Sequence, residues 1–142
     1  MDESLEFFKQ EFQLRNVDIR TYSPLVLAYI GDGVYEMVVR TILVNQGNCP
    51  VNSLHKMSSQ LVKASAQAKM MDVLEPILTE EELQVFKRGR NAHSGTMAKN
   101  ATMGEYRRAT GFEAVMGYLY LKEDCKRITE LSKIGLNHIK KK

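Results

Sequence analysis

The feature that most constrains the fold is a long apolar stretch from Pro24 to Val44, whose hydrophobic residues cover most of the circumference of a helix. Ser23 and Pro24 form a typical helix start, because serine caps the first turn and proline suits the first helical position. The segment from Gly47 to Pro50 ends the helix. The pattern predicts a helix buried on several sides, and the charged residues inside it argue against a membrane span.

Asp32 interrupts this stretch by placing a carboxylate between Gly31 and Gly33. Burying an unpaired carboxylate is energetically expensive, so we expect Asp32 to be protonated, ion-paired or bound to a metal. Glu113 repeats the anomaly inside a second apolar run that extends to Leu121. If the two helices pack together, the two carboxylates face each other.

Two converging carboxylates with glycines beside them suit a hard cation such as Mg²⁺, which binds few carboxylates and keeps several waters. Glu36 follows Asp32 by one turn and is a candidate accessory acid, as a further carboxylate, a water-positioning group or an ion-pair partner. The residues alone leave an equal alternative, in which Arg40, Arg107 or buried water satisfies both carboxylates.

The rest of the chain also has helical periodicity and no useful β-type alternation. Capping boxes at Thr79 and Thr102 each start a helix. The fold class is therefore all-α, with about six to seven helices. We expect them at about 5–14, 24–44, 52–74 (a short helix followed by a longer one), 80–90, 103–121 and 123–138, with a polar, glycine-containing loop at 91–101.

Length and charge set the context. The 142 residues suffice for a single domain, with its core at about 22–136 and a basic tail at 137–142. The net charge of +3 weakly favours a polyanionic partner. The N-terminus lacks a signal-peptide pattern, which points to the cytoplasm, where Cys49 and Cys125 are expected to be reduced thiols.

Three separated motifs carry a resemblance to a known family. The segment from Tyr29 to Tyr35 resembles the signature helix of ribonuclease III catalytic domains, and the segment from Phe112 to Leu121 resembles the second acidic helix of that family. The segment from Lys87 to Thr96, together with the lack of room for a double-stranded-RNA-binding domain, resembles the Mini-ribonuclease III branch, which consists of the catalytic domain alone.

This resemblance implies a ribonuclease III-like endonuclease domain in which Asp32 and Glu113 are catalytic and bind the metal. The larger family usually has further acids at the positions of Ala28 and Thr110, and the branch resembles this chain at both places. The implied cofactor is Mg²⁺, with Mn²⁺ as a substitute, in a site that takes one metal ion or two.

The same resemblance implies an endoribonuclease that hydrolyses double-stranded or structured RNA as a homodimer. The expected substrate is the precursor of large-subunit (23S) ribosomal RNA in a bacterial cytoplasm, with a ribosomal protein as a further candidate partner. We expect RNA contacts from polar and basic residues around the loop, namely Lys87, Arg88, Arg90, Asn91, Ser94, Lys99, Arg107 and Arg108. For each one alone, a solvated helix end is the competing interpretation.

Two other classes remain at this stage. A non-catalytic ribonuclease III-like module that binds RNA in ribosome assembly would keep the basic loop, but it would tolerate loss of Asp32 and Glu113. A helical metal-dependent phosphohydrolase for nucleotides would also use buried carboxylates, but the chain shows no histidine–aspartate pair to hold its metal.

Overall fold

A computed structural model of the chain describes residues 3–92 and 102–140. Within these residues every regular element is helical, which confirms the all-α prediction. The α-helices are α1 (Glu3–Glu11), α2 (Pro24–Asn45), α3 (Val51–Val62), α4 (Ala64–Leu74), α5 (Glu80–Asn91), α6 (Met103–Leu121) and α7 (Cys125–Lys140). Two 3₁₀ turns, Ile19–Thr21 and Glu75–Ile77, precede α2 and α5.

The helix starts follow the predicted capping residues. The Ser23 hydroxyl accepts a hydrogen bond from the Val26 amide at 3.2 Å, and Pro24 opens α2. Thr79 and Thr102 each form a complete capping box, with Glu82 in α5 and Glu105 in α6. These local bonds satisfy amide groups that a helix leaves unpaired in its first turn.

Helix boundaries differ from the predicted ones in three places. Helix α1 ends at Glu11, and α3 and α4 are of similar length, because the chain turns at Lys63 with an extended ψ of 157°. Helix α7 runs on to Lys140. The predicted loop at 91–101 and the last part of the basic tail lie mostly outside the described residues.

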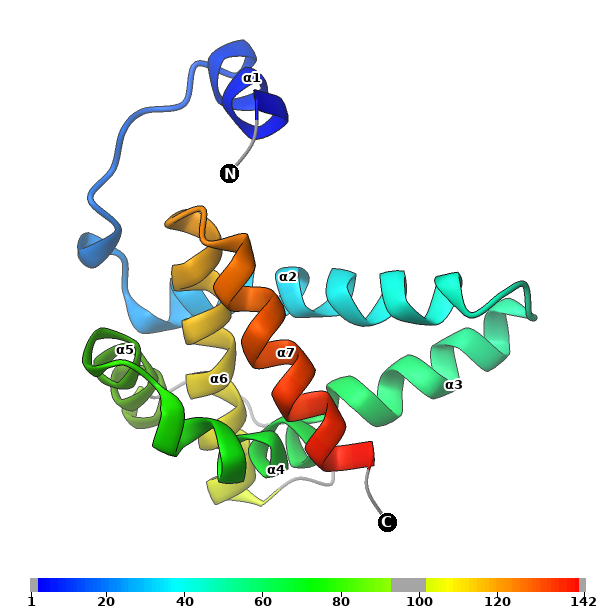
Figure 1. The fold of residues 1–142 in the computed structure, drawn as a ribbon. Coiled ribbons are helices and arrows are strands. Elements are labelled where there is room, and N and C mark those ends of the chain that lie inside the picture. Colours follow the sequence, from blue (N-terminus) through cyan, green and yellow to red (C-terminus); the bar gives the residue numbers. More distant parts are fainter. Residues whose placement is uncertain (1–2, 93–101, 141–142) are drawn as a thin grey trace.

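Helix α6 is the centre of the molecule. It is surrounded by α2, α4, α5 and α7, and Figure 1 shows α7 beside it. From Ala109 to Leu119 every residue except Glu113 is buried. This stretch of α6 is therefore enclosed by its neighbours, and Glu113 is the one residue in it that is not fully buried.

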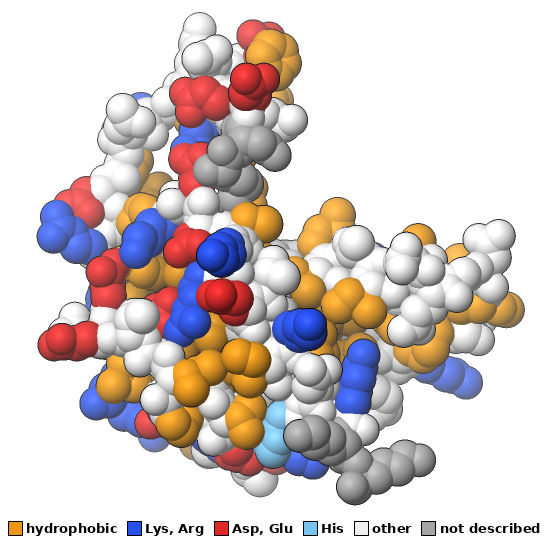
Figure 2. Space-filling model, viewed as in Figure 1, with side chains coloured by type: hydrophobic (Ala, Val, Ile, Leu, Met, Phe, Trp, Pro, Cys, Tyr) orange, Lys and Arg blue, Asp and Glu red, His pale blue; other side chains and the backbone are white. Residues whose placement is uncertain are grey.

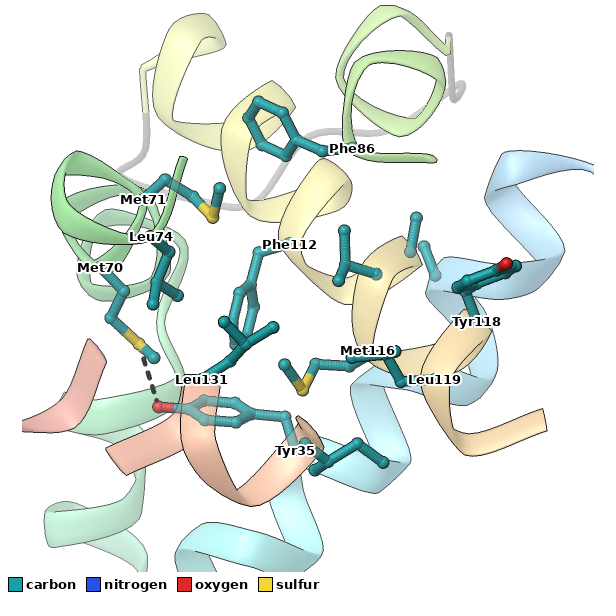
Figure 3. Packing of buried hydrophobic residues seen from close by; sticks show 14 of the residues in the cluster. Tyr35, Met70, Met71, Leu74, Phe86, Phe112, Met116, Tyr118, Leu119 and Leu131 are labelled. Carbon is teal, nitrogen blue, oxygen red and sulfur yellow. Dashed lines mark hydrogen bonds between the residues drawn. The ribbon is translucent and has the colours of Figure 1, made fainter. Parts of the chain in front are cut away.

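Aromatic and thioether side chains fill the space between α2, α4 and α6 (Figure 3). The rings of Tyr35 and Phe112 meet edge to face, with centroids 4.9 Å apart. The Tyr35 hydroxyl lies 3.2 Å from the Met70 sulfur and 3.3 Å from the Leu61 carbonyl oxygen. This fully buried tyrosine joins α2 to α3 and α4 and fixes their spacing around α6.

A paired charge holds α7 against α5. Arg127 donates two hydrogen bonds of 2.9 Å to the carboxylate of Glu82, which is only 4% exposed. Burial raises the pKa of Glu82, but the Arg127 guanidinium and the capping bond with Thr79 outweigh burial and hold the pKa below its ordinary value. The carboxylate that caps α5 is thus also the anchor for α7.

The prediction that the Pro24 to Val44 helix is buried on several sides is wrong for the single chain. Helix α2 buries one face and projects with α3 beyond the rest of the molecule, as the cyan and green helices of Figure 1 show. Its other face exposes Val26, Tyr29, Met37 and Val44. Figure 2 shows orange hydrophobic side chains at the surface along this projection. The apolar residues that the core does not bury are left available for another partner.

Two further observations concern the chain as a whole. Within the described residues no helix is long and apolar enough to cross a membrane. Cys49 and Cys125 are both exposed free thiols.

Candidate active site

The site forms where α2 crosses α6, and two glycines make that crossing close. A Cβ atom built on Gly31 would overlap the carbonyl oxygen of Glu113 and would lie 2.7 Å from the Gly117 nitrogen. A Cβ atom built on Gly117 would overlap the Leu27 carbonyl oxygen. The two backbones therefore touch at positions where only glycine fits. Asp32, which follows Gly31, and Glu113, whose backbone lies against Gly31, are therefore brought to the same crossing.

Asp32 and Glu113 are neighbours at this crossing. The pKa of Glu113 is raised from its ordinary value to about 8 by burial first, then by the Asp32 charge and by a hydrogen bond shared with Asp32. Such coupling requires the two carboxyl groups to lie within contact distance. The predicted pairing of the two acids is therefore found in the structure.

The sequence pattern predicts that both acids are buried, but the structure buries only one of them. Asp32 is exposed, and Glu113 is the acid that is mostly buried. The reason is helical geometry: Asp32 follows Gly31, which faces α6, by about 100° of rotation. Asp32 therefore lies at the rim of the crossing with access to solvent, while Glu113 lies on the inner side.

Gln67 in α4 is a third member of the site that sequence reasoning missed. Its side chain is 1% exposed, and its Nε2 donates hydrogen bonds to Glu113 Oε2 at 3.4 Å and to the Val62 carbonyl oxygen at 3.0 Å. The signal was present in the sequence, because Gln67 is a long polar residue between Ala66 and Ala68 on a helix that packs inward.

The remaining candidate acid, Glu36, pairs with Arg40, one of the basic alternatives. Glu36 accepts a hydrogen bond from Arg40 at 3.1 Å, an exposed pair one turn apart on α2. Of the roles considered for Glu36, the structure shows the ion pair. Arg40 is therefore engaged with Glu36, and the causes that shift the Glu113 pKa include no cation.

Ala28 and Thr110, where the larger family has acids, are buried and uncharged. Ala28 belongs to the buried face of α2, and the Thr110 hydroxyl donates to the Tyr106 carbonyl oxygen of its own helix at 2.9 Å. Among the residues that the structure describes, the acids identified at this crossing are thus Asp32 and Glu113. Within residues 3–92 and 102–140 no group of three or more histidine, cysteine or acidic side chains converges as a metal site.

The residues at the crossing nevertheless fit a divalent cation bound mainly by water and substrate. Two carboxylates in contact repel each other when both are charged, and a cation between them removes that cost. Gln67 Oε1 is a buried acceptor with no hydrogen-bond partner among the described residues, so the site holds an unsatisfied polar atom beside the residue that contacts Glu113. Mg²⁺ commonly binds through one or two carboxylates and several waters.

Six of the eight predicted RNA-contacting residues belong to the described part of the chain, and they lie at the end of α5 and the start of α6. Lys87, Arg88 and Asn91 are exposed at the C-terminal end of α5. The Arg90 guanidinium lies 5.7 Å from the centre of the Phe86 ring, and its Nε donates to Asn91 at 3.3 Å.

In α6, Arg107 and Arg108 are partly exposed. Arg108 pairs with Asp72 at 3.0 Å and lines one hollow together with Lys87. Ser94 and Lys99 lie outside the described residues. The structure thus brings α5 and α6 residues together, and it shows Arg108 already neutralised by an acid.

Comparison with known proteins shows the family of the chain. Residues 25–124 match the Ribonuclease III domain family, and this span includes both acids, Gln67 and the basic cluster. The chain is 49% identical over 133 residues to Mini-ribonuclease 3 of Clostridium tetani, covering 92% of this chain and 86% of the relative. It is 41% identical over 140 residues to Mini-ribonuclease 3 of a Thermoanaerobacter species, covering 98% and 99%.

A solved structure shows the same fold. The crystal structure of a Fusobacterium nucleatum protein superposes with a TM-score of 0.78 at 30% sequence identity, covering 86% of this chain and 94% of that one. The matched family, the shared length and the paired acids at the crossing of α2 and α6 lead to one conclusion. The chain belongs to the ribonuclease III family and is an endoribonuclease of the Mini-ribonuclease 3 kind.

Proposed function

We propose that the protein cleaves double-stranded RNA in a reaction that depends on Mg²⁺, with Asp32 and Glu113 as the residues that hold the cation. The observation that carries the proposal is the contact between these two carboxyl groups; burial first, and then the Asp32 charge and a hydrogen bond with Asp32, raise the Glu113 pKa to about 8. A protein gains no stability from such a contact unless a proton or a cation is shared there. A divalent cation is the partner that suits hydrolysis of a phosphodiester.

The two acids have different proposed roles because Asp32 is exposed and Glu113 is mostly buried. When bound, Mg²⁺ supplies a more acidic water and offsets negative charge on the scissile phosphate. Asp32 lies at the exposed rim, where an RNA phosphate can approach. Glu113 lies on the central helix α6, and its side chain is mostly buried. With Ala28 and Thr110 uncharged, Asp32 and Glu113 would hold the cation, and water and phosphate oxygens would supply its other ligands.

The RNA is proposed to be a duplex recognised by shape, since A-form RNA is contacted mainly through phosphates and 2′-hydroxyls. Arg88 and Arg90 at the end of α5 and Arg107 at the start of α6 are the proposed phosphate contacts within the described residues. The proposed physiological substrate is the precursor of large-subunit ribosomal RNA in the bacterial cytoplasm, with a ribosomal protein as helper. The support for this finer statement is the sequence resemblance to the Mini-ribonuclease III branch.

We also propose a homodimer that cuts both strands, one per subunit. The support is the exposed face of α2, where Val26, Tyr29, Met37 and Val44 recur at intervals of three, eight and seven residues. These intervals keep the side chains on one face of a helix. Tyr29 is 83% exposed, which is unusual for a large aromatic side chain in a helix of this hydrophobicity. A second copy presenting the same face would cover it.

The deciding experiment incubates the Asp32→Asn variant with duplex RNA and Mg²⁺, measures the extent of cleavage and maps the ends of the products. We expect Mg²⁺-dependent cleavage to fall by about 100-fold or more, because the exposed metal ligand is lost, while folding and dimerisation persist. Asp18→Asn is the matched control, since Asp18 is an exposed acid paired with Arg20 away from the crossing. Undiminished cleavage by Asp32→Asn would overturn the assignment of the active site.

A further inference from the structure

Gln67 is the buried polar residue whose position the paired acids do not explain. It lies in the first turns of α4, just after the corner at Lys63 where α3 ends. Its side chain is 1% exposed, so both ends of its carboxamide are enclosed by protein. A buried carboxamide is stabilising only when its hydrogen-bonding groups are used, so each contact of Gln67 carries information.

The Nε2 group of Gln67 makes two contacts at once. It donates to the Val62 carbonyl oxygen at 3.0 Å, which satisfies the last carbonyl of α3, and to Glu113 Oε2 at 3.4 Å. The first contact holds the carboxamide in place, because Val62 is fixed by the corner between α3 and α4. The second contact then points a positioned donor at one oxygen of the Glu113 carboxylate, on the side away from solvent.

The Oε1 group of Gln67 has no hydrogen-bond partner although it is buried. The capping of α3 uses the Nε2 donor alone, so it does not account for a buried Oε1 acceptor, which destabilises the fold when it is unpaired. The orphaned acceptor belongs to the same carboxamide that contacts Glu113. The Gln67 carboxamide therefore fits a polar site at Glu113 better than a purely structural role at the corner between α3 and α4.

We propose that Gln67 is a positioning residue of the active site, which holds the Glu113 carboxylate in the orientation that lets it share a cation with Asp32. This inference rests on the proposed function, because it assigns Gln67 to the same cation site. The 3.4 Å bond is long for a hydrogen bond to a carboxylate, and catalytic hydrogen bonds commonly tighten only when the substrate binds. Residues that orient metal ligands in this way typically change metal affinity by about 10- to 100-fold when replaced.

The test measures Mn²⁺ binding to the full-length protein without RNA, from the loss of the free-ion signal in electron paramagnetic resonance. Gln67→Met keeps the length and volume of the side chain and removes the donor. We expect its Mn²⁺ affinity to fall by about 10-fold or more relative to the unmodified protein. Gln60→Met is the matched control, since Gln60 is an exposed glutamine on α3 that accepts a hydrogen bond from Lys63 at 2.9 Å; its Mn²⁺ affinity is expected to be unchanged.

A merely structural role for Gln67 gives a different result. Loss of the Val62 contact alone would lower the melting temperature of Gln67→Met while leaving its Mn²⁺ affinity equal to that of the unmodified protein. That outcome would overturn the proposal. The proposed function fails separately, because then the unmodified protein itself would neither bind Mn²⁺ nor cleave duplex RNA.

A second measurement needs no substitution at position 67 and serves if Gln67→Met does not fold. The side-chain amide resonances of Gln67 are followed by ¹⁵N–¹H correlation spectra while Mg²⁺ is added to the unmodified protein. We expect the Gln67 pair to shift downfield with Mg²⁺, the Gln60 pair to stay constant, and the Gln67 shift to vanish in Glu113→Ala. Gln67 resonances that stay constant at saturating Mg²⁺ would contradict the positioning role.

Discussion

The backbone of Gly31 in α2 lies directly against the backbone of Glu113 in α6. A Cβ atom at position 31 would overlap the Glu113 carbonyl oxygen and lie 2.7 Å from the Glu113 carbonyl carbon. The absence of a side chain at Gly31 thus sets the separation of the two helices. Because Asp32 and Glu113 lie at the same crossing, the separation of the helices also sets the distance between their carboxyl groups.

Gly31→Ala is therefore expected to be destabilising, even though alanine is intrinsically the better helix former. We expect the free energy of unfolding to fall by about 2 kcal/mol or more, because the added methyl group meets rigid backbone and the helices must separate. Urea denaturation measures the change. Gly104→Ala is the control, since a Cβ atom at Gly104 would meet nothing within 4 Å. Equal stability of both variants would rule out the close crossing.

Glu113 makes the stability depend on pH. Its pKa is raised from 4.5 to about 8, so the folded protein keeps a proton that the unfolded chain has released. Without divalent cations, the contribution of Glu113 to the free energy of unfolding is greatest below about pH 4.5 and is lost as pH rises to about 8. The slope from this group is at most about 1.4 kcal/mol per pH unit. Urea denaturation in a chelating buffer across this range measures it.

Glu113→Gln is the variant that isolates this effect, because a carboxamide cannot lose the proton. We expect the variant to show a shallower decline in stability between about pH 5 and pH 8 than the unmodified protein. The same titration predicts that the affinity for Mg²⁺ rises with pH in this window, since the cation requires the charged carboxylate. Superimposable pH profiles for the variant and the unmodified protein would show that Glu113 is not the titrating group.

Met37→Glu tests the proposed dimer. Met37 is 65% exposed on the free face of α2, and a buried glutamate opposite its own copy would be desolvated and repelled. Light scattering coupled to size-exclusion chromatography is expected to give 16.2 kDa for the variant and twice that mass for the unmodified protein. Ile134→Glu, on α7, makes the same kind of change at a residue that is 41% exposed, and should leave the dimer intact.

Arg88→Ala and Arg90→Ala test the proposed phosphate contacts at the end of α5. Each lost contact should weaken RNA binding and reduce the slope of log affinity against log salt by somewhat less than one unit. The effect should be similar for duplexes of different sequence. Lys126→Ala removes one charge from an exposed residue on α7 and serves as the control for net charge alone. If the arginine variants keep the salt slope of the unmodified protein, these residues do not contact phosphate.

Local elements were predictable because their signals are local. The capping boxes at Thr79 and Thr102 and the Ser23–Pro24 start each act within one turn of helix, and each appears in the structure at the expected residue. The corner at Lys63 was less predictable, because no proline or glycine marks it and its position depends on packing of α4 against α6 and α7.

The sequence by itself determined an all-helical chain and singled out Asp32 and Glu113, because a charge inside an apolar helix is visible without any tertiary contact. Only the tertiary structure decided which acid is buried, since that depends on how α2 is rotated at Gly31 against α6. It also decided that one apolar face of α2 stays exposed, and that Gln67 reaches Glu113 from another helix. These are relations between residues far apart in the chain, and helical periodicity carries no information about which faces meet.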